Sequence, residues 1–198
     1  MLLLKRIELA TFPWAKFRRK KGDIKVHVLY DVKAQAPAFY TVTTASKHDS
    51  TTMYTISYEP NTYYIFDRAY DSFKKLYRIH LTGSFFVVRT ETNLKYTLVK
   101  WKRRMPKNIL TDAEVKLAGY LSEKKYPESF RLIRYYDEED DREFTFLTNA
   151  THISALDIAS LYKKRWLVEL FVYHQYSVPT ILQAVTPISF LKKYFGSF

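Results

Sequence analysis

A run of five residues that favour buried β-strands, Thr62–Phe66, ends directly in an aspartate, Asp67. Such a compact β-branched and aromatic run is typical of an interior strand in an α/β sheet. Sheets of this class place reactive groups at the carboxyl ends of their strands. A second interpretation is that Asp67 only ends the strand and caps the helix predicted for residues 72–80. The run alone leaves both interpretations open.

The clearest predicted helix covers residues 154–173, where Ser154 can cap the first turn. Tyr162, Arg165 and Glu169 follow one another at spacings of three and four residues, so they share one face. A glutamate among apolar neighbours is costly unless it is paired or bound to a cation. Arg165 offers an internal ion pair to Glu169 as the alternative to a bound cation.

The remaining segments alternate between strand patterns and polar connections. Strands are predicted for residues 24–32 and 38–44, and for the short segments 85–88, 95–99, 114–118, 131–136 and 143–147. Five consecutive acids at 137–141 predict an exposed, solvated hairpin loop, because adjacent acids cannot all converge on one metal ion.

The charge balance favours a polyanionic partner, because Lys and Arg outnumber Asp and Glu by 32 to 20, a formal net charge of +12. Basic clusters lie at residues 18–21, 100–104 and 163–165. The absence of cysteine excludes disulfides, thiolate zinc sites and cysteine nucleophiles. No glycine-rich nucleotide loop and no membrane-length apolar run occur, so we expect a cytoplasmic protein that does not enter membranes.

Residues 158–171 resemble the Y-R-E part of the Y-x2-R-x3-E-x6-K signature of bacterial insertion-sequence DDE transposases, with Tyr162, Arg165 and Glu169 at the motif positions. The segment 66–71, Phe-Asp-Arg-Ala-Tyr-Asp, is similar to the same branch around its second aspartate. Further blocks resemble the family in the expected order, at residues 12–18, 21–22, 25–27, 85–89 and 146–149.

The resemblance implies an α/β fold with a ribonuclease-H-like mixed sheet and a β-rich insertion before the last catalytic helix. On this basis residues 1–84 are the first part of the core and residues 85–150 the insertion. Residues 151–175 carry the catalytic-glutamate helix, and residues 176–198 form a divergent tail.

The resemblance also assigns chemistry to single residues. Asp67 and Glu169 become the second and third metal-binding carboxylates, which hold Mg²⁺, with Mn²⁺ as a substitute, for DNA strand cleavage and transfer. Tyr162 and Arg165 are expected to steady the helix and contact DNA phosphate. Further DNA contacts are expected from the basic residues Arg68, Lys100, Arg103 and Arg104.

The sequence departs from the family at both ends. The family's first aspartate lies on the central strand, about a dozen residues before the 12–18 block, a place that falls at or before Met1. The signature lysine should stand at position 176, which is Tyr176. We therefore expect a truncated or decayed copy, with residues 2–7 pairing where the central strand is lost.

Three alternatives follow. The first is a transposase core fragment that acts on transposon ends and target DNA, works as a homodimer in a synaptic complex, and is catalytically incomplete. The second is a non-catalytic, basic DNA-binding remnant. The third is a structural, nuclease-like remnant with no biological role. The histidines lack the paired spacing of a zinc site, so structural or surface roles are expected for all five.

Overall fold

The computed structural model of the protein describes residues 3–7, 16–18, 21–44, 46–70, 72–90, 94–102, 104–170 and 188–194. The strands are β1 (Leu3–Ile7), β2 (Lys16–Arg18), β3 (Lys21–Asp31), β4 (Ala36–Thr44), β5 (Thr62–Phe66), β6 (Phe85–Arg89), β7 (Tyr96–Trp101), β8 (Ile109–Leu117), β9 (Phe130–Asp137), β10 (Arg142–Thr148) and β11 (Ile188–Tyr194). The helices are α1 (Phe73–Leu81), α2 (Tyr120–Lys125) and α3 (Ala155–Lys163), with 3-10 turns η1 (Asp49–Tyr54) and η2 (Arg68–Tyr70).

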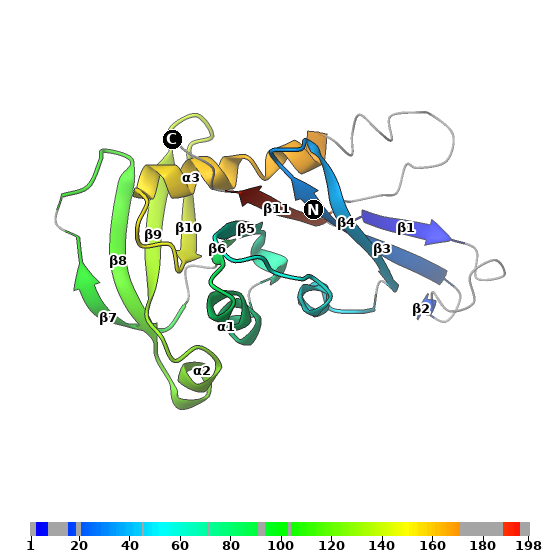
Figure 1. Cartoon of the computed structure of the whole chain (residues 1–198), viewed down its shortest axis with the longest axis horizontal. Helices are drawn as coiled ribbons and strands as arrows, with labels where there is room; N and C mark the ends of the chain where they lie inside the picture. The colour runs from blue at the N-terminus through cyan, green and yellow to red at the C-terminus, as the bar shows by residue number, and fades with distance from the viewer. Residues whose placement is uncertain are drawn as a thin grey trace.

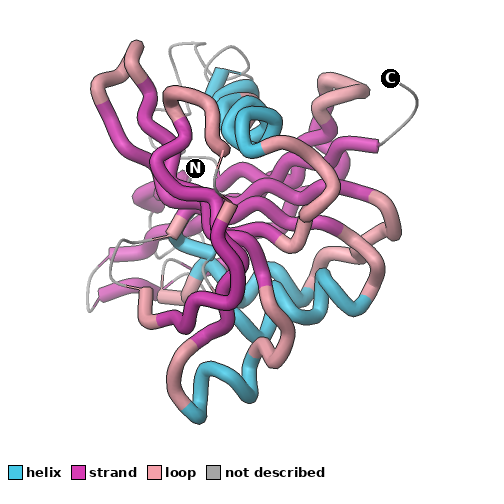
Figure 2. The backbone as a smooth tube through the Cα atoms, turned by 90° about the vertical axis from the view of Figure 1, so that its left-hand side faces the viewer, coloured by secondary structure: helices cyan, strands magenta, loops and turns pink. Residues whose placement is uncertain are grey.

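One mixed sheet runs through the molecule in the order β1-β3-β11-β5-β6-β10-β9-β8-β7, and β2 and β4 also pair with β3. The pairs β5–β6 and β3–β11 are parallel, and the other pairs are antiparallel. Helix α3 lies on one side of the sheet, and α1 and α2 lie on the other (Figures 1 and 2). This arrangement confirms the predicted α/β class with a mixed sheet.

Each face of the sheet has its own hydrophobic core. The first core packs α1 side chains such as Leu76 and Ile79 against alternate residues of β5, including Tyr64 and Phe66. The second core packs α3 against the other residues of β5, such as Ile65. Because β5 is covered on both faces, all five of its residues are buried, as its continuous apolar run predicts.

The parallel pairing of β5 with β6 sets the position of the site. Phe66 pairs with Val88, so the next residues along the two strands, Asp67 and Arg89, lie side by side at the carboxyl end. Strand β10 continues the sheet beyond β6, and the hairpin β9–β10 and strands β8 and β7 follow it. The insertion boundaries at residues 85–150 stay a prediction.

The strand between β3 and β5 is β11, from the C-terminal part of the chain. It pairs in parallel with residues 27–31 of β3 and antiparallel with residues 62–65 of β5. Strand β1 pairs with residues 22–26 of β3, so β1 and β11 follow one another along the same edge. The expectation that residues 2–7 take the place of a central strand is therefore wrong: β1 pairs with β3, and β11 is the strand that joins β3 to β5.

Three details differ from the sequence predictions. The predicted helix over 154–173 is interrupted, because α3 ends at Lys163, a turn covers 164–165, and helix resumes at 166–170; residues 171–173 lie outside the described residues. The predicted exposed loop begins with a buried residue, since Asp137 is 2% exposed. Helix α2 was not predicted. No helix in the described part of the chain is long and apolar enough to cross a membrane.

Candidate functional site

Asp67 lies where β5 leaves the interior, immediately before η2. Its carboxylate is partly buried, and its Oδ1 accepts a 2.8 Å hydrogen bond from the backbone N–H of Arg68. The residue that precedes α1 is Ser72, so Asp67 does not cap that helix. The capping interpretation is therefore wrong for α1, although Asp67 accepts the N–H of the first residue of η2. Asp67 is a carboxylate at the carboxyl end of an interior strand.

Tyr162 brings α3 to this strand end. Its ring is buried against Phe146, with ring centroids 4.7 Å apart, and its hydroxyl donates a 3.1 Å hydrogen bond to Oδ1 of Asp67. The capping box of Ser154 and Asp157 fixes the start of α3, and the packing of its buried residues sets its rotation relative to the sheet. Tyr162, the first residue of the stripe that the sequence predicts, thus faces the end of β5.

Arg165 and Glu169 follow Tyr162 along the same stripe. The Arg165 Nη1 donates a 2.6 Å hydrogen bond to Oε1 of Glu169, and its guanidinium lies over the Tyr162 ring at 5.6 Å. The ion pair expected as an alternative is therefore present. It joins the turn at 164–165 to the helical residues 166–170 that follow. In the turn the backbone switches to tighter hydrogen bonds, from Arg165 N–H to Tyr162 and from Val168 N–H to Arg165.

The electrostatics tie the two acids together through Arg165. Burial raises the pKa of Asp67, but the charge of Arg165, the Arg68 N–H and the Tyr162 hydroxyl outweigh it, and the net pKa lies below the ordinary value. Burial and the neighbouring Asp67 charge raise the pKa of Tyr162 to about 12. Burial disfavours the Arg165 charge, but Tyr162, Asp67 and Glu169 raise its pKa overall. Asp67 is ionised and Tyr162 is a neutral donor at neutral pH.

The carboxylates of Asp67 and Glu169 are suitable ligands for a divalent cation, but two side chains supply only part of the ligands that such an ion needs. Carboxylate oxygens are the ligands that Mg²⁺ prefers. Both hydrogen bonds to Asp67 converge on Oδ1, so within the described residues Oδ2 carries none. Among the residues that the structure describes, no group of three or more acidic or histidine side chains could hold a metal ion. Asp67 and Glu169 would thus be two ligands of a larger set.

The residues predicted to contact DNA fall into separate places. Arg68 is exposed beside Asp67, whereas Tyr162 is buried. Lys100 and Arg104 are exposed at or after β7, which is five strands away from β5 in the sheet order. Arg103 lies outside the described residues. The structure therefore groups Arg68, Tyr162 and Arg165 around Asp67 and places Lys100 and Arg104 at the far edge.

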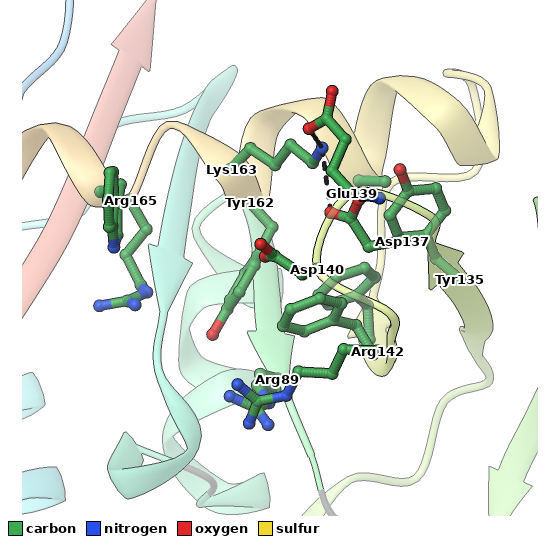
Figure 3. Close-up of a pocket in the computed structure, with 13 residues that line it drawn as sticks. Arg89, Tyr135, Asp137, Glu139, Asp140, Arg142, Tyr162, Lys163 and Arg165 are labelled. Atoms are coloured by element: carbon green, nitrogen blue, oxygen red, sulfur yellow. Dashed lines mark hydrogen bonds and ion pairs between the residues drawn. The ribbon is translucent and has the colours of Figure 1, made fainter.

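A pocket of about 320 Å³ opens next to this group (Figure 3). It is lined by Arg89, Tyr135, Asp137, Glu139, Asp140, Arg142, Phe144, Phe146, Ala159, Tyr162, Lys163, Arg165 and Trp166. Sequence reasoning missed Arg89, Arg142 and Phe144 as site residues. The signal for Arg89 was its position at the end of a second apolar strand, 85–89; the other two offered no local signal.

Comparison with known proteins adds a family and two relatives. The family model described as "Transposase DDE domain" matches residues 10–173. A protein of Sinorhizobium fredii strain NGR234 named "Putative transposase y4zB" is 32% identical over 162 residues, which cover 79% of this chain and 45% of the relative. A protein of Geobacillus stearothermophilus named "Probable transposase for insertion sequence element IS5377" is 27% identical over 175 residues, which cover 85% of this chain and 45% of the relative. The chain spans about half the length of the curated relatives it matches.

Proposed function

Because this chain belongs to the transposase DDE domain family, we propose that it is the core of an insertion-sequence transposase that acts on DNA phosphodiesters at transposon ends. The resemblance to insertion-sequence DDE transposases is confirmed by the family match, and with it the α/β, ribonuclease-H-like class of the fold. The substrate, the metal and the residue roles below are proposals that rest on the geometry of the site.

The observation that carries the proposal is the hydrogen bond from Tyr162 to Asp67. It brings the end of β5 and Tyr162 together, and the charges of both Asp67 and Glu169 act on Arg165, although Asp67 comes from a distant part of the sequence. A purely structural ion pair between Arg165 and Glu169 accounts for neither the orientation of Tyr162 nor the partly buried, ionised Asp67.

The side chains divide the work as follows. Asp67 offers Oδ2 to a cation, while Tyr162 and the Arg68 N–H hold its Oδ1 and fix the orientation of the carboxylate. Glu169 offers the second carboxylate of the proposed cation site, and Arg165 balances the charges of Asp67 and Glu169. Mg²⁺, with Mn²⁺ as a substitute, supplies Lewis-acid chemistry for phosphodiester cleavage and transfer when bound.

We expect this chain alone to cleave DNA weakly or not at all. A two-metal site needs more acceptor oxygens than Asp67 and Glu169 provide, and removal of one ligand leaves less negative charge to hold both ions. The alternative function is DNA binding without catalysis, which the formal charge of +12 favours. A homodimer that holds two transposon ends belongs to the first proposal and can be sought by light scattering with and without DNA.

Calorimetric titration with Mn²⁺ separates the two functions. We expect the wild-type chain to bind Mn²⁺ and Asp67→Asn to lose this binding. The matched control is Asp31→Asn, because Asp31 also follows the apolar part of a strand but accepts hydrogen bonds from the backbone N–H groups of Lys33 and Ala34. Equal Mn²⁺ affinity in wild type and Asp67→Asn would favour DNA binding without a metal site. Cleavage of transposon-end DNA by the purified chain with Mg²⁺ would contradict the expected inactivity.

A further inference from the structure

Two arginines in the pocket stack on the same aromatic ring. The guanidinium of Arg89 lies 5.1 Å from the centroid of Phe144, and that of Arg142 lies 5.3 Å from it. Arg142 and Phe144 alternate along β10, so both project from the face that also carries Tyr135 and Asp137 of the paired strand β9. The ring holds both cations in place without neutralising their charge.

Acidic side chains pair with most of the cations around them. Ion pairs engage Lys25, Lys102, Lys107, Arg131, Arg134, Lys163 and Arg165. Within the described part of the chain, no such pair involves Arg89 or Arg142, although three acids line the same pocket. Their guanidinium N–H groups are therefore available to an anion that comes from outside the fold.

Two acids of the pocket already have a cationic partner. Lys163 is 2.9 Å from Oδ2 of Asp137 and 3.1 Å from Oε2 of Glu139, which ties these acids to α3 (Figure 3). This pairing offsets part of their negative charge, so a bound anion is drawn to the two arginines that have no acidic partner among the described residues. The cationic part of the pocket is thus formed by Arg89 of β6 and Arg142 of β10.

Arg89 lies at the same end of the sheet as the proposed reaction centre. Asp67 and Arg89 directly follow the paired residues Phe66 and Val88 on parallel strands, which are spaced about 4.8 Å apart in a sheet. The charge of Arg89 also reaches Tyr162, whose pKa it lowers against the larger effect of burial. An anion held by Arg89 therefore lies near Tyr162, the residue whose hydroxyl bonds to Asp67.

We propose that Arg89 and Arg142, stacked on Phe144, form an arginine clamp that binds a backbone phosphate of one DNA strand, next to the phosphodiester at Asp67. The planar fork of arginine suits phosphate oxygens, and two forks on one ring present several donors at once. A recess of about 320 Å³ admits a phosphate and its sugar from one strand and excludes a duplex. This inference rests on the proposed function, because it assumes a DNA substrate.

The test is a salt titration of DNA binding. Binding is measured by the fluorescence anisotropy of a labelled single-stranded oligonucleotide. The variants are Arg89→Gln and Arg142→Gln, in the full chain. The control is Arg134→Gln, which removes one arginine charge from β9, the strand next to β10. Arg134 lies on the opposite face of the sheet from the pocket and pairs there with Glu143. Thermal unfolding of each variant shows whether its fold is retained.

We expect each clamp variant to bind about tenfold more weakly than wild type, as for the loss of one charge-assisted phosphate contact. The slope of log K against log salt should shrink by about 0.7 for each lost contact with a single strand. Arg134→Gln should match wild type in both measures. Clamp variants that match Arg134→Gln in affinity and slope would overturn the clamp while leaving the proposed function standing.

Two further outcomes distinguish the clamp from the proposed function and from a site for free phosphate. If the wild-type chain shows no salt-dependent DNA binding, the proposed function fails and the clamp fails with it. Calorimetric titration with inorganic phosphate at constant ionic strength identifies the source of the phosphate. We expect no binding of inorganic phosphate to the wild-type chain; phosphate binding that Arg142→Gln abolishes, together with an unchanged affinity of that variant for the oligonucleotide, would assign the pocket to free phosphate and overturn the DNA assignment.

Discussion

The hydroxyl of Tyr162 donates a 3.1 Å hydrogen bond to Oδ1 of Asp67, and 95 residues separate the two in the sequence. The bond joins the carboxyl end of β5 to α3, with strands β6 to β10 between them in the chain. Because Tyr162 is also packed against Phe146 of β10, the position of Asp67 depends on the folding of the whole intervening segment. The candidate site is therefore a product of tertiary structure rather than of one local motif.

Replacement of Tyr162 by phenylalanine should lower the free energy of unfolding by about 1.5–3 kcal/mol at neutral pH, the usual net contribution of a hydrogen bond to a charged group. The ring contacts with Phe144 and Phe146 remain in Tyr162→Phe, so only the hydroxyl is lost. Urea denaturation at pH 7 measures the change. The matched control is Tyr136→Phe, because the Tyr136 hydroxyl also donates to an aspartate, Asp141, but in an exposed turn. Equal losses in the two variants would contradict a special role for the buried bond.

The same pair predicts a pH dependence. The folded-state pKa of Asp67 lies below the ordinary value of 3.8, since Arg165 and the two hydrogen bonds outweigh the effect of burial. The ionised carboxylate therefore stabilises the fold above pH 3.8, and this contribution is lost as the pH falls through the folded pKa. Asp67→Asn should flatten the stability profile of the chain in this acidic range. A profile that keeps its wild-type slope would show that Asp67 is not the titrating group.

Replacement of Arg131 by leucine should destabilise the fold by about 3–5 kcal/mol, the usual cost when one partner of a buried ion pair is removed. Arg131 is 3% exposed, forms 2.6 and 2.7 Å hydrogen bonds with both oxygens of Asp112, and donates to the carbonyls of Ala150 and Ile153. It thus links β8 and β9 to the segment that leads into α3. Chemical denaturation should show the loss.

Two comparisons make the Arg131 prediction specific. Arg134→Leu removes an arginine from an exposed pair with Glu143 and should change the free energy of unfolding by less than about 1 kcal/mol. A double variant, Arg131→Leu with Asp112→Leu, should recover part of the loss, because it leaves no unpaired buried charge. A double variant less stable than Arg131→Leu alone would contradict this account.

The sequence predicted the elements whose signals are local. The apolar run of β5, the strands of residues 85–148 and the stripe of Tyr162, Arg165 and Glu169 all follow from composition and spacing within a few residues. The interruption at 164–165 could not be predicted, because Lys164 and Arg165 favour helix. The long-range contact next to the interruption is the hydrogen bond from Tyr162 to Asp67, because the pair of Arg165 with Glu169 is local and favours helix.

The missed parts of the site depend on strand pairing. Arg89 lies beside Asp67 only because β5 and β6 are parallel in a particular register, and Arg142 reaches the pocket only through the β9–β10 hairpin. The run of five acids predicts that Asp137 is exposed; in the structure it is buried as the last residue of β9, where it pairs with Lys163 of α3. The place of the first aspartate and the domain boundaries stay predictions.

Substitution of Leu191 by proline should destabilise the sheet by about 2 kcal/mol more than Leu191→Ala, because proline removes a backbone donor from an interior strand. Leu191 pairs with Tyr30 of β3 and with Ile65 of β5, so β11 is the link between the two parts of the sheet. Hydrogen exchange should speed up at the amides of β3 and β5 in Leu191→Pro. Alanine keeps the N–H group and serves as the control; equal exchange in the two variants would show that β11 does not join β3 to β5.

Acid should destabilise the protein through His27, which is 1% exposed in β3. Its ring nitrogens bond to the hydroxyls of Tyr70 at 3.1 Å and Thr43 at 2.9 Å, and burial lowers its pKa from 6.5 to about 4 against the opposing charge of Asp49. Between these two values the unfolded chain binds a proton that the folded chain does not, so the free energy of unfolding falls as the pH drops through this window. This difference in pKa corresponds to a loss of about 3 kcal/mol in the free energy of unfolding between pH 7 and pH 4. Urea denaturation across this range should show the decline in wild type and a flatter profile in His27→Gln; parallel profiles, or an NMR titration of His27 near its ordinary pKa, would contradict the prediction.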